Sequence, residues 1–231
     1  MTECAPVTVL AVDGPSGSGK GTISRLLANA LGWHLLDSGA LYRLVVISGR
    51  QAGLQSSDVE RHAALAAVMN VLFAVGAQGE ERIVLNGLEV TDQVREEATG
   101  QEASLMAAWP SVRSALMDRQ RAFAQNPGLV ADGRDMGTVV FPQAPLKIFL
   151  TATPDERAKR RYNQLKDKDS AVNLAHLSRE ITERDLRDYS RSVSPLITAE
   201  DAIVIDSTGL SVAFIVEKVL GIGRDRALWK I

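Results

Sequence analysis

A glycine-rich segment directly after an apolar run is the feature that most constrains the fold of this chain. Residues 7–12 are apolar except for Thr8, and residues 14–22 read Gly-Pro-Ser-Gly-Ser-Gly-Lys-Gly-Thr. Glycines let successive backbone N–H groups turn inward toward phosphate oxygens, and Lys20 adds a positive charge. Apolar residues at helical spacing follow over residues 23–31, and the start of a helix favours anions. The sequence therefore predicts a strand, a phosphate-binding loop (P-loop) and a helix, in that order.

The residue after the lysine narrows the class of P-loop protein. Many such proteins have Ser or Thr at that position, where its hydroxyl binds Mg²⁺, but this chain has Gly21 followed by Thr22. A Gly-Lys-Gly-Thr ending is typical of kinases that phosphorylate small nucleotides. Thr22 is therefore the candidate metal ligand, directly or through water.

Composition excludes several other classes. The chain has 231 residues, 45% hydrophobic and 23% charged, and a formal net charge of −2, which argues against a protein that mainly binds duplex nucleic acid. Its single cysteine, Cys4, excludes a disulfide framework and a Cys-based zinc site. No apolar run approaches membrane-spanning length, and residues 1–12 lack the features of a signal peptide. We expect a cytoplasmic protein without a membrane or nucleic-acid partner.

Short apolar runs alternate with longer helical patterns over most of the chain. Strands are predicted at residues 7–12, 34–37, 129–132, 146–150 and 202–206. This alternation implies an α/β fold with a five-stranded parallel sheet flanked by helices. Ligands of such sheets bind beyond the C-terminal strand ends. Acidic residues stand at four of these ends, namely Asp13, Asp37, Asp132 and Asp206.

The stretch from residue 71 to residue 90 breaks this alternation. Its three β-type runs are residues 71–75, 82–85 and 88–90, joined by Gly-containing turns at 76–80 and at Asn86-Gly87. Such short runs with tight turns predict a small antiparallel three-stranded insert. Helical patterns flank it, over residues 57–69 and about 97–125.

A second candidate phosphate site begins at Ser38, in the segment Leu-Asp-Ser-Gly-Ala-Leu-Tyr-Arg of residues 36–43. The segment follows a strand and enters a helix, so N–H groups near Ser38 are placed to meet an anion. Arg43 lies about one turn into that helix, and a guanidinium can hold a phosphate with two parallel hydrogen bonds. The alternative is an ordinary helix cap and a solvated arginine.

Charged residues also crowd the end of the strand at residues 129–132. Asp132, Arg134 and Asp135 stand close together, and Gly133, between the first two, permits close approach of a ligand. Burying these charges without partners would be costly. They form either a structural salt bridge or a site where Arg134 holds phosphate and a carboxylate reads a base or sugar.

A dense charged run extends from residue 155 to residue 191. Arg184, Asp188 and Arg191 fall at i, i+4 and i+7 of a helix and would share one face. Another helical face would be shared by Arg157, Arg160 and Arg161. Such runs are commonly solvated helix surfaces. The alternative is a mobile flap that closes over phosphates and excludes water.

Taken together, these segments resemble the bacterial type of the cytidylate (CMP) kinase family, within the P-loop nucleoside monophosphate (NMP) kinases. The resemblance covers about residues 6–220 and rests on the P-loop, residues 36–43, residues 131–138 and residues 183–191. It implies an NMP-kinase fold in three parts. These would be a core of residues 1–36, 126–153 and 192–231, an NMP-binding domain of residues 37–125 with the β insert near 71–90, and a short helical lid with its adjoining helix at residues 154–191.

The resemblance implies ATP-dependent phosphorylation of CMP and dCMP to the diphosphate by direct in-line transfer, with Mg²⁺ and in a monomer. The catalytic residues it implies are Lys20, Arg134, Arg184 and Arg191. The residues it implies at ATP are Gly14, Pro15, Ser16, Gly17, Ser18, Gly19, Lys20, Gly21, Thr22, Arg157, Arg160 and Arg161. Those it implies at CMP are Ser38, Tyr42, Arg43, Ser104, Arg113, Gly133, Arg134, Asp135, Arg184, Asp188 and Arg191.

Two other functions are compatible with a P-loop. The first is a kinase for another small substrate, such as UMP or AMP. The second is a nucleotide switch, but its guanine-reading Asn-Lys-x-Asp tetrapeptide does not occur in this chain. The tail from Arg224, which contains Trp229, either packs or frays.

Overall fold

The computed structural model describes residues 7–75, 81–166 and 173–230, and the chain divides into two compact units. The larger unit comprises Met1–Asp37 and Gln120–Ile231, and the smaller unit comprises Ser38–Arg119. The turn expected at 76–80 and the part of the expected lid at 167–172 lie outside the described residues.

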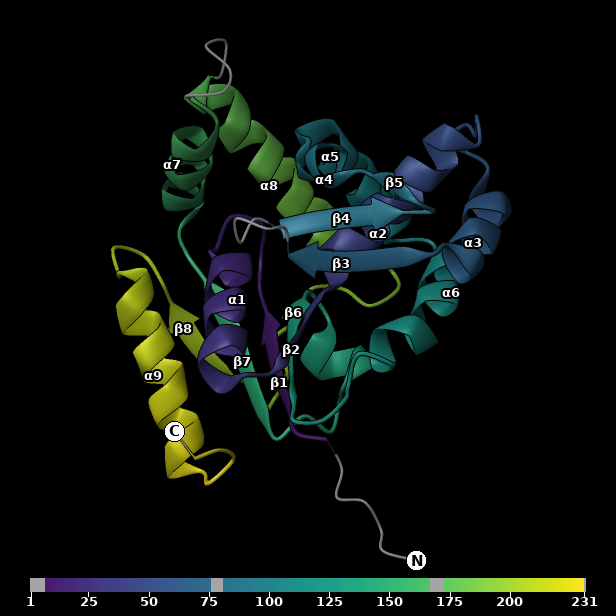
Figure 1. Ribbon diagram of the computed structural model, residues 1–231. Coiled ribbons are helices and arrows are strands. Elements are labelled where there is room, and N and C mark those ends of the chain that lie inside the picture. Colours follow the sequence, from purple (N-terminus) through teal and green to yellow (C-terminus); the bar gives the residue numbers. More distant parts are fainter. Residues whose placement is uncertain (1–6, 76–80, 167–172, 231) are drawn as a thin grey trace, which may run out of the picture. The chain divides into compact units, whose positions relative to one another are not determined.

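The larger unit is built on a parallel sheet with the strand order β2-β6-β1-β7-β8 (Figure 1). Its strands are β1 (Val9–Asp13), β2 (His34–Asp37), β6 (Leu129–Gly133), β7 (Leu146–Thr151) and β8 (Ile203–Asp206). Each neighbouring pair is parallel, as the alternating pattern predicted. The five predicted strands are confirmed to within two residues at their ends.

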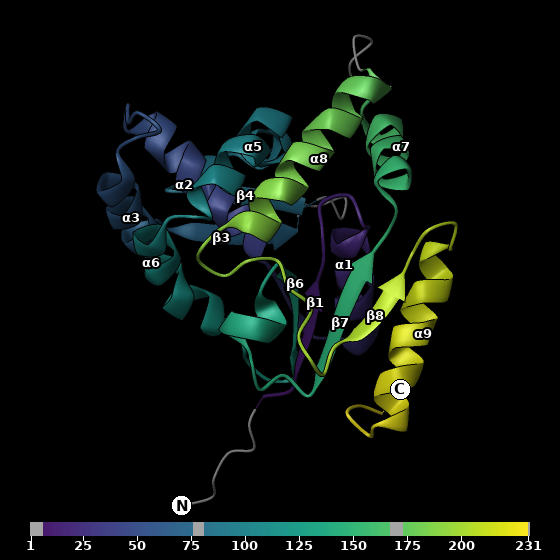
Figure 2. The ribbon, with the colours of Figure 1, turned by 180° about the vertical axis from the view of Figure 1, so that it is seen from behind.

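Helices complete the larger unit. They are α1 (Lys20–Leu31), the single π-helical turn η1 (Met136–Val140), α7 (Pro154–Leu165), α8 (Leu174–Ser190) and α9 (Val212–Asp225). Both α1 and α9 contribute to one apolar core with the sheet, through Ile23, Leu27, Ile215 and Val219. In Figure 2, seen from behind, β1 and β7 lie in front of α1. Among the described residues, no helix combines the length and the apolar character that crossing a bilayer requires.

Trp229 anchors the C-terminal tail to this core. Its ring meets that of Trp33 edge to face at 5.4 Å, and its Nε1 donates to the carbonyl oxygen of Leu220 at 3.2 Å. Gly223 makes room for the ring, because a Cβ there would lie 1.8 Å from a ring carbon. The tail therefore packs as far as the described residues reach.

Asp13 ties the end of β1 to the segment that follows β6. Its two carboxylate oxygens accept hydrogen bonds from the N–H groups of Met136 and Gly137, each at 2.8 Å. Burial raises the pKa of Asp13 to about 6, although the two backbone hydrogen bonds act in the opposite direction. One buried side chain thus positions the loop between β6 and η1 beside the strand that leads into the P-loop.

The smaller unit contains five helices and a separate antiparallel sheet of order β3-β4-β5 among the residues described. Its elements are α2 (Ser38–Gln51), α3 (Val59–Val68), β3 (Val71–Val75), β4 (Glu81–Leu85), β5 (Leu88–Glu89), α4 (Thr91–Arg95), α5 (Glu97–Met106) and α6 (Pro110–Arg121), the last of which ends within the larger unit. Asn86 and Gly87, which join β4 to β5, have φ values of +50° and +84°. Positive φ at both turn residues is typical of the tight hairpins that the sequence predicted.

The helical pattern predicted over residues 97–125 is two helices rather than one. Helix α5 ends at Met106, and α6 begins at Pro110. Proline has no N–H group to continue a helix, and it disfavours helical geometry at the residue before it, Trp109. It is well suited to the first position of a new helix, where it stands here.

Asp13→Asn is expected to change how stability depends on pH. The folded-state pKa of about 6 lies above the ordinary value of 3.8, so Asp13 contributes stability that is complete below pH 3.8 and is lost as the pH rises through 6. Asparagine does not titrate. The free energy of unfolding of the wild type relative to the variant should therefore fall by about 2 kcal/mol between about pH 4 and about pH 7.5. Urea denaturation at several pH values measures the two free energies of unfolding. If their difference does not change with pH, Asp13 is ionised in the folded protein over this whole range.

Candidate active site

The P-loop runs from Gly14 to Thr22, between β1 and α1. Gly14, Gly17 and Gly19 have φ values of +147°, +76° and +94°, which side chains other than glycine rarely adopt. At Gly14 space is also limiting, because a Cβ would lie 2.0 Å from the carbonyl oxygen of Leu150. The glycines are therefore required by the backbone and, at the first position, by the packing of β7.

Lys20 begins α1, and its side chain turns back toward the loop. Its Nζ donates to the carbonyl oxygen of Pro15 at 2.8 Å, and the residue is only 5% exposed. Burial lowers the pKa of Lys20 to about 7; the positive charges of Arg134 and Arg184 act in the same direction, and Asp132 opposes them. A bound polyphosphate would favour the protonated form of this lysine.

Asp132 is buried at the end of β6, next to Asp37 at the end of β2. Burial raises the pKa of Asp132 to about 7, an effect that Lys20 opposes and the charge of Asp37 reinforces. A Cβ on Gly21 would lie 3.4 Å from Oδ2 of Asp132. The carboxylate thus faces the P-loop, and glycine at position 21 leaves space beside it.

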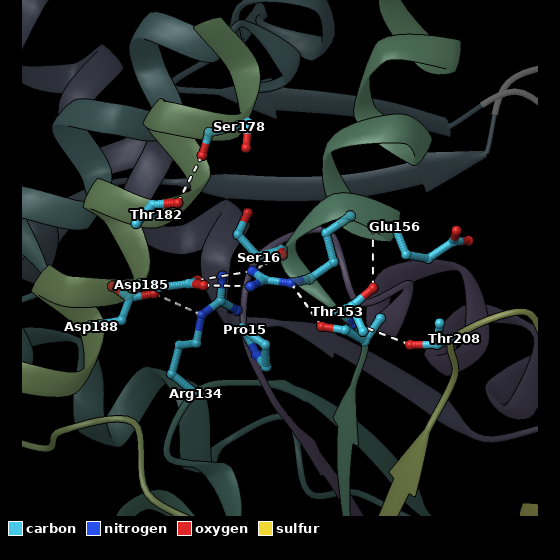
Figure 3. Close-up of polar contacts among 12 residues, drawn as sticks. Pro15, Ser16, Arg134, Thr153, Glu156, Ser178, Thr182, Asp185, Asp188 and Thr208 are labelled. Atoms are coloured by element: carbon cyan, nitrogen blue, oxygen red, sulfur yellow. Dashed lines mark hydrogen bonds and ion pairs between the residues drawn. The ribbon is translucent and has the colours of Figure 1, made fainter. Parts of the chain in front are cut away.

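Arg134 pairs with Asp188 of α8. Its Nε donates to Oδ2 of Asp188 at 3.0 Å, and its NH1 donates to the carbonyl oxygen of Gly133 at 3.2 Å (Figure 3). Burial alone would raise the pKa of Asp188, but Arg134, Arg184 and Arg191 outweigh it and lower that pKa. The charged residues at the end of β6 are therefore joined to the charged run on α8, as members of one electrostatic group.

Helix α8 ends at Ser190, one residue before Arg191. Arg191 is the C-cap, and its N–H still makes the helical hydrogen bond to the carbonyl oxygen of Arg187, at 3.1 Å, so the predicted spacing of Arg184, Asp188 and Arg191 runs to the end of the helix. Arg191 has the extended backbone of a C-cap, and its Nε donates to the carbonyl oxygen of Ser194. Its positive charge acts on Asp188 and helps to lower the pKa of that carboxyl.

The arginines of α7 contact the P-loop itself. Arg157 donates to the carbonyl oxygen of Ser16 at 3.0 Å, and Arg160 donates to that of Ser18 at 3.2 Å. Arg157 also forms a two-bond ion pair with Asp185 of α8. Arg161 differs from them, since its NH1 donates to the nearby side chain of Gln164 at an exposed position.

The smaller unit holds the other predicted CMP residues. Arg43 donates to the carbonyl oxygens of Val94 and Glu96, at 2.7 and 2.9 Å. Arg113 lies 6.0 Å from the centre of the Tyr42 ring and donates to its hydroxyl at 3.1 Å. Ser38 at the start of α2 and Ser104 in α5 are both buried.

The predicted site residues therefore fall into two groups, one in each unit. The larger unit holds Gly14–Thr22, Gly133, Arg134, Asp135, Arg157, Arg160, Arg161, Arg184, Asp188 and Arg191. The smaller unit holds Ser38, Tyr42, Arg43, Ser104 and Arg113.

Sequence reasoning gave Asp13 and Asp185 no role at the site, and it named Asp132 only as one of the charges at the end of its strand. The two strand-end aspartates had a usable signal, because acidic residues at the C-terminal ends of buried parallel strands lie where ligands bind. Asp185 had a weaker one, its place in the charged run three residues before Asp188. Ser207 lies in the loop of residues 206–210, which the resemblance places near the adenine of ATP, and its buried hydroxyl donates to the carbonyl oxygen of Ser18 at 3.1 Å.

The oxygen donors beside the P-loop suit Mg²⁺, a hard cation that takes one or two carboxylates together with substrate phosphates. They are the exposed Thr22, in the first turn of α1, and the neighbouring Asp37 and Asp132. Within the described ranges, no group of three or more His, Cys, Asp or Glu side chains could hold a metal by itself. The donor set therefore fits a magnesium ion that arrives with a nucleotide.

Comparison with known proteins identifies the family of this chain. The cytidylate kinase of Stutzerimonas stutzeri is 54% identical over 96% of this chain and 98% of its own length. That of Colwellia psychrerythraea is 52% identical over 95% of this chain and 96% of its own length, and that of Pseudomonas aeruginosa is 56% identical over 93% and 94%. The model of the cytidylate kinase family matches residues 10–224. The resemblance found in the sequence is thereby confirmed, and this chain belongs to the cytidylate kinase family.

Proposed function

We propose that the chain transfers the γ-phosphoryl group of ATP to CMP, and to dCMP, with release of ADP and the corresponding diphosphate. The observation that carries the proposal is the group of cations around Lys20. Lys20 is buried, and the charges of Arg134 and Arg184 both disfavour its protonated form. Two half-buried arginines that converge on a buried lysine repel it, which is costly in a protein that binds no anion. A nucleotide polyphosphate would relieve that repulsion, and family membership supports CMP as the acceptor rather than UMP or AMP.

Each unit supplies part of the proposed machinery. In the larger unit the P-loop N–H groups and Lys20 would bind the ATP phosphates, while Arg134 and Arg191 would bind the CMP phosphate. Asp135, a buried acceptor beside Gly133, would read the exocyclic amine of cytosine. Arg184 and Asp188 would contact the sugar. In the smaller unit we assign Ser38 and Arg43 to the CMP phosphate and Ser104 and Arg113 to the base. Tyr42, whose hydroxyl accepts a hydrogen bond from Arg113, is assigned to CMP binding.

The chemistry needs no covalent intermediate on the protein. A phosphate monoester is itself a nucleophile at neutral pH, so the acceptor oxygen of CMP attacks the γ-phosphorus in line as the bond to ADP breaks. The protein contributes position and positive charge, through Lys20, Arg134 and Arg184. Bound Mg²⁺ would neutralise charge on the ATP phosphates; Thr22, Asp37 and Asp132 would hold it, directly or through water.

For the partners, the oligomeric state and the cellular compartment we propose what the sequence led us to expect. The net charge of −2 gives no general attraction to nucleic acid, so we propose nucleotides as the only partners of a cytoplasmic monomer. Size-exclusion chromatography with light scattering measures the mass, for which we expect 24.9 kDa.

A coupled ADP-release assay across CMP, dCMP, UMP and AMP tests the function directly. We expect CMP and dCMP to give the highest kcat/KM, because the carboxylate of Asp135 accepts a hydrogen bond from a cytosine amine but repels the carbonyl of uracil. A clear preference for UMP or AMP would refute the proposed acceptor, while leaving a P-loop kinase.

Lys20→Ala is expected to reduce kcat by about 10³-fold, because it removes a buried positive charge from the transferred group. Circular dichroism should show an unchanged fold. Arg25→Ala, which removes an exposed charge from the same helix, is the matched control and should retain activity. Near-normal turnover by a folded Lys20→Ala protein would contradict the proposed role of the P-loop.

Asp135→Ala is expected to reduce the preference for CMP over UMP by about 10²-fold, since a site that has lost its acceptor no longer distinguishes an amine from a carbonyl. The ratio of kcat/KM values for the two substrates measures this. Asp135→Asn keeps the size of the side chain and supplies a donor, so it should shift the ratio further toward UMP. An unchanged ratio in both variants would make Asp135 a structural residue.

A further inference from the structure

Helix α7 reaches the P-loop on the side of its carbonyl oxygens. NH1 of Arg157 donates to the carbonyl oxygen of Ser16 at 3.0 Å, and NH1 of Arg160 donates to that of Ser18 at 3.2 Å. A Cβ on Gly17 would lie 3.0 Å from Cβ of Arg157. The glycine between the two carbonyls therefore allows the helix to come this close.

Arg157 is itself held in place on several sides. Its Nε donates to the carbonyl oxygen of Ala152 at 3.1 Å, and its two terminal nitrogens donate to the two carboxylate oxygens of Asp185, at 3.0 and 2.5 Å. The residue is 3% exposed. Figure 3 shows the Asp185 carboxylate directed from α8 toward the region of Ser16. A guanidinium bonded along both its edges has one orientation, and here that orientation is set by Asp185.

Arg160 is fixed in the same manner, by a residue of its own helix and by Ser207, which follows β8. Its Nε donates to Glu156 at 2.8 Å, and its NH2 donates to the carbonyl oxygen of Ser207 at 2.7 Å. The hydroxyl of Ser207 also lies 3.1 Å from the carbonyl oxygen of Ser18. The second P-loop carbonyl is thus approached by two side chains.

The orientation of these carbonyls determines where the P-loop donors point. In a planar trans peptide the C=O and the following N–H point in opposite directions. Holding the carbonyls of Ser16 and Ser18 toward α7 therefore turns the N–H groups of Gly17 and Gly19 away from it. Amides directed in this way are what a phosphate-binding loop offers its ligand.

We propose that Arg157 and Arg160 are positioning residues, which orient the P-loop amides, and that Asp185 sets the affinity for ATP through Arg157 without touching the nucleotide. The proposal deepens the proposed function and rests on it for the identity of the nucleotide. It gives Arg157 and Arg160 a role other than the direct contact with ATP that the sequence led us to expect.

Asp185→Asn distinguishes positioning of the P-loop by Arg157 from direct binding of ATP by Arg157, because the two roles predict different changes in the affinity for ATP. If Arg157 positions the loop, losing its ionic partner should raise the dissociation constant for ATP about tenfold, in isothermal titration calorimetry. If Arg157 instead binds ATP directly, removing a competing carboxylate should leave ATP binding unchanged or make it tighter, and this would overturn the proposal. Asp155→Asn removes an equal charge from an exposed position on α7 and should leave the constant unchanged.

Arg157→Lys tests the ion pair between Arg157 and Asp185 by changing the arginine, and it keeps the proposal testable if Asp185→Asn does not fold. Lysine keeps the charge but loses the two-pronged geometry, so ATP binding should weaken by a similar factor. The KM for ATP should rise while the KM for CMP stays the same. The variant that combines Asp185→Asn with Arg157→Lys should bind ATP no more weakly than either single variant. If the losses of ATP affinity instead add, Asp185 does not act through Arg157.

Hydrogen exchange of the Gly17 and Gly19 amides, followed by NMR without nucleotide, distinguishes failure of this inference from failure of the proposed function. In Asp185→Asn we expect faster exchange at Gly17, whose peptide Arg157 holds, and little change at Gly19, whose peptide Arg160 and Ser207 hold; Asp155→Asn should leave both unchanged. This result would support the positioning role even if the wild type did not phosphorylate CMP. Unchanged exchange at Gly17 in a folded Asp185→Asn protein would overturn it.

Discussion

Burial of charge where the parallel strands end is the constraint on which the larger unit depends. An ion removed from water must find partners, and three charged residues here find them in other elements. Asp13 accepts two backbone N–H groups from the start of η1. Arg134 forms an ion pair with Asp188 of α8, and Arg157 forms one with Asp185 of the same helix. These pairings join β1 to η1, the end of β6 to α8, and α7 to α8, so paired charges hold the fold together around the P-loop.

The parts of this arrangement that the sequence predicted are those set by local pattern. Apolar runs gave the five strands, and the Asn86-Gly87 pair gave the hairpin between β4 and β5, because both depend on neighbouring residues. The break between α5 and α6 was missed, although Pro110 marks it. The pairing of Arg157 with Asp185 could not be predicted, since it depends on how α7 and α8 pack, and many carboxylates in the charged run were equally near in sequence.

Helix α8 engages two parts of the larger unit through residues less than one turn apart. Asp185 holds the arginine that contacts the P-loop, and Asp188 holds the arginine that follows β6 (Figure 3). Residues three apart lie on the same face of a helix, so a rotation of α8 would alter both pairs together. The P-loop and the segment that follows β6 are therefore mechanically linked through a single turn of α8.

The edge-to-face tryptophan pair has a practical consequence. The chain contains three tryptophans, of which Trp33 and Trp229 lie in the core of the larger unit and Trp109 lies in the smaller one. The intrinsic tryptophan fluorescence of each unit therefore comes from different tryptophans. A chain that keeps only Trp109 would report the environment of the smaller unit, and one that keeps only the pair would report the larger. Unfolding followed in both would reveal whether the two units melt in one cooperative transition or separately.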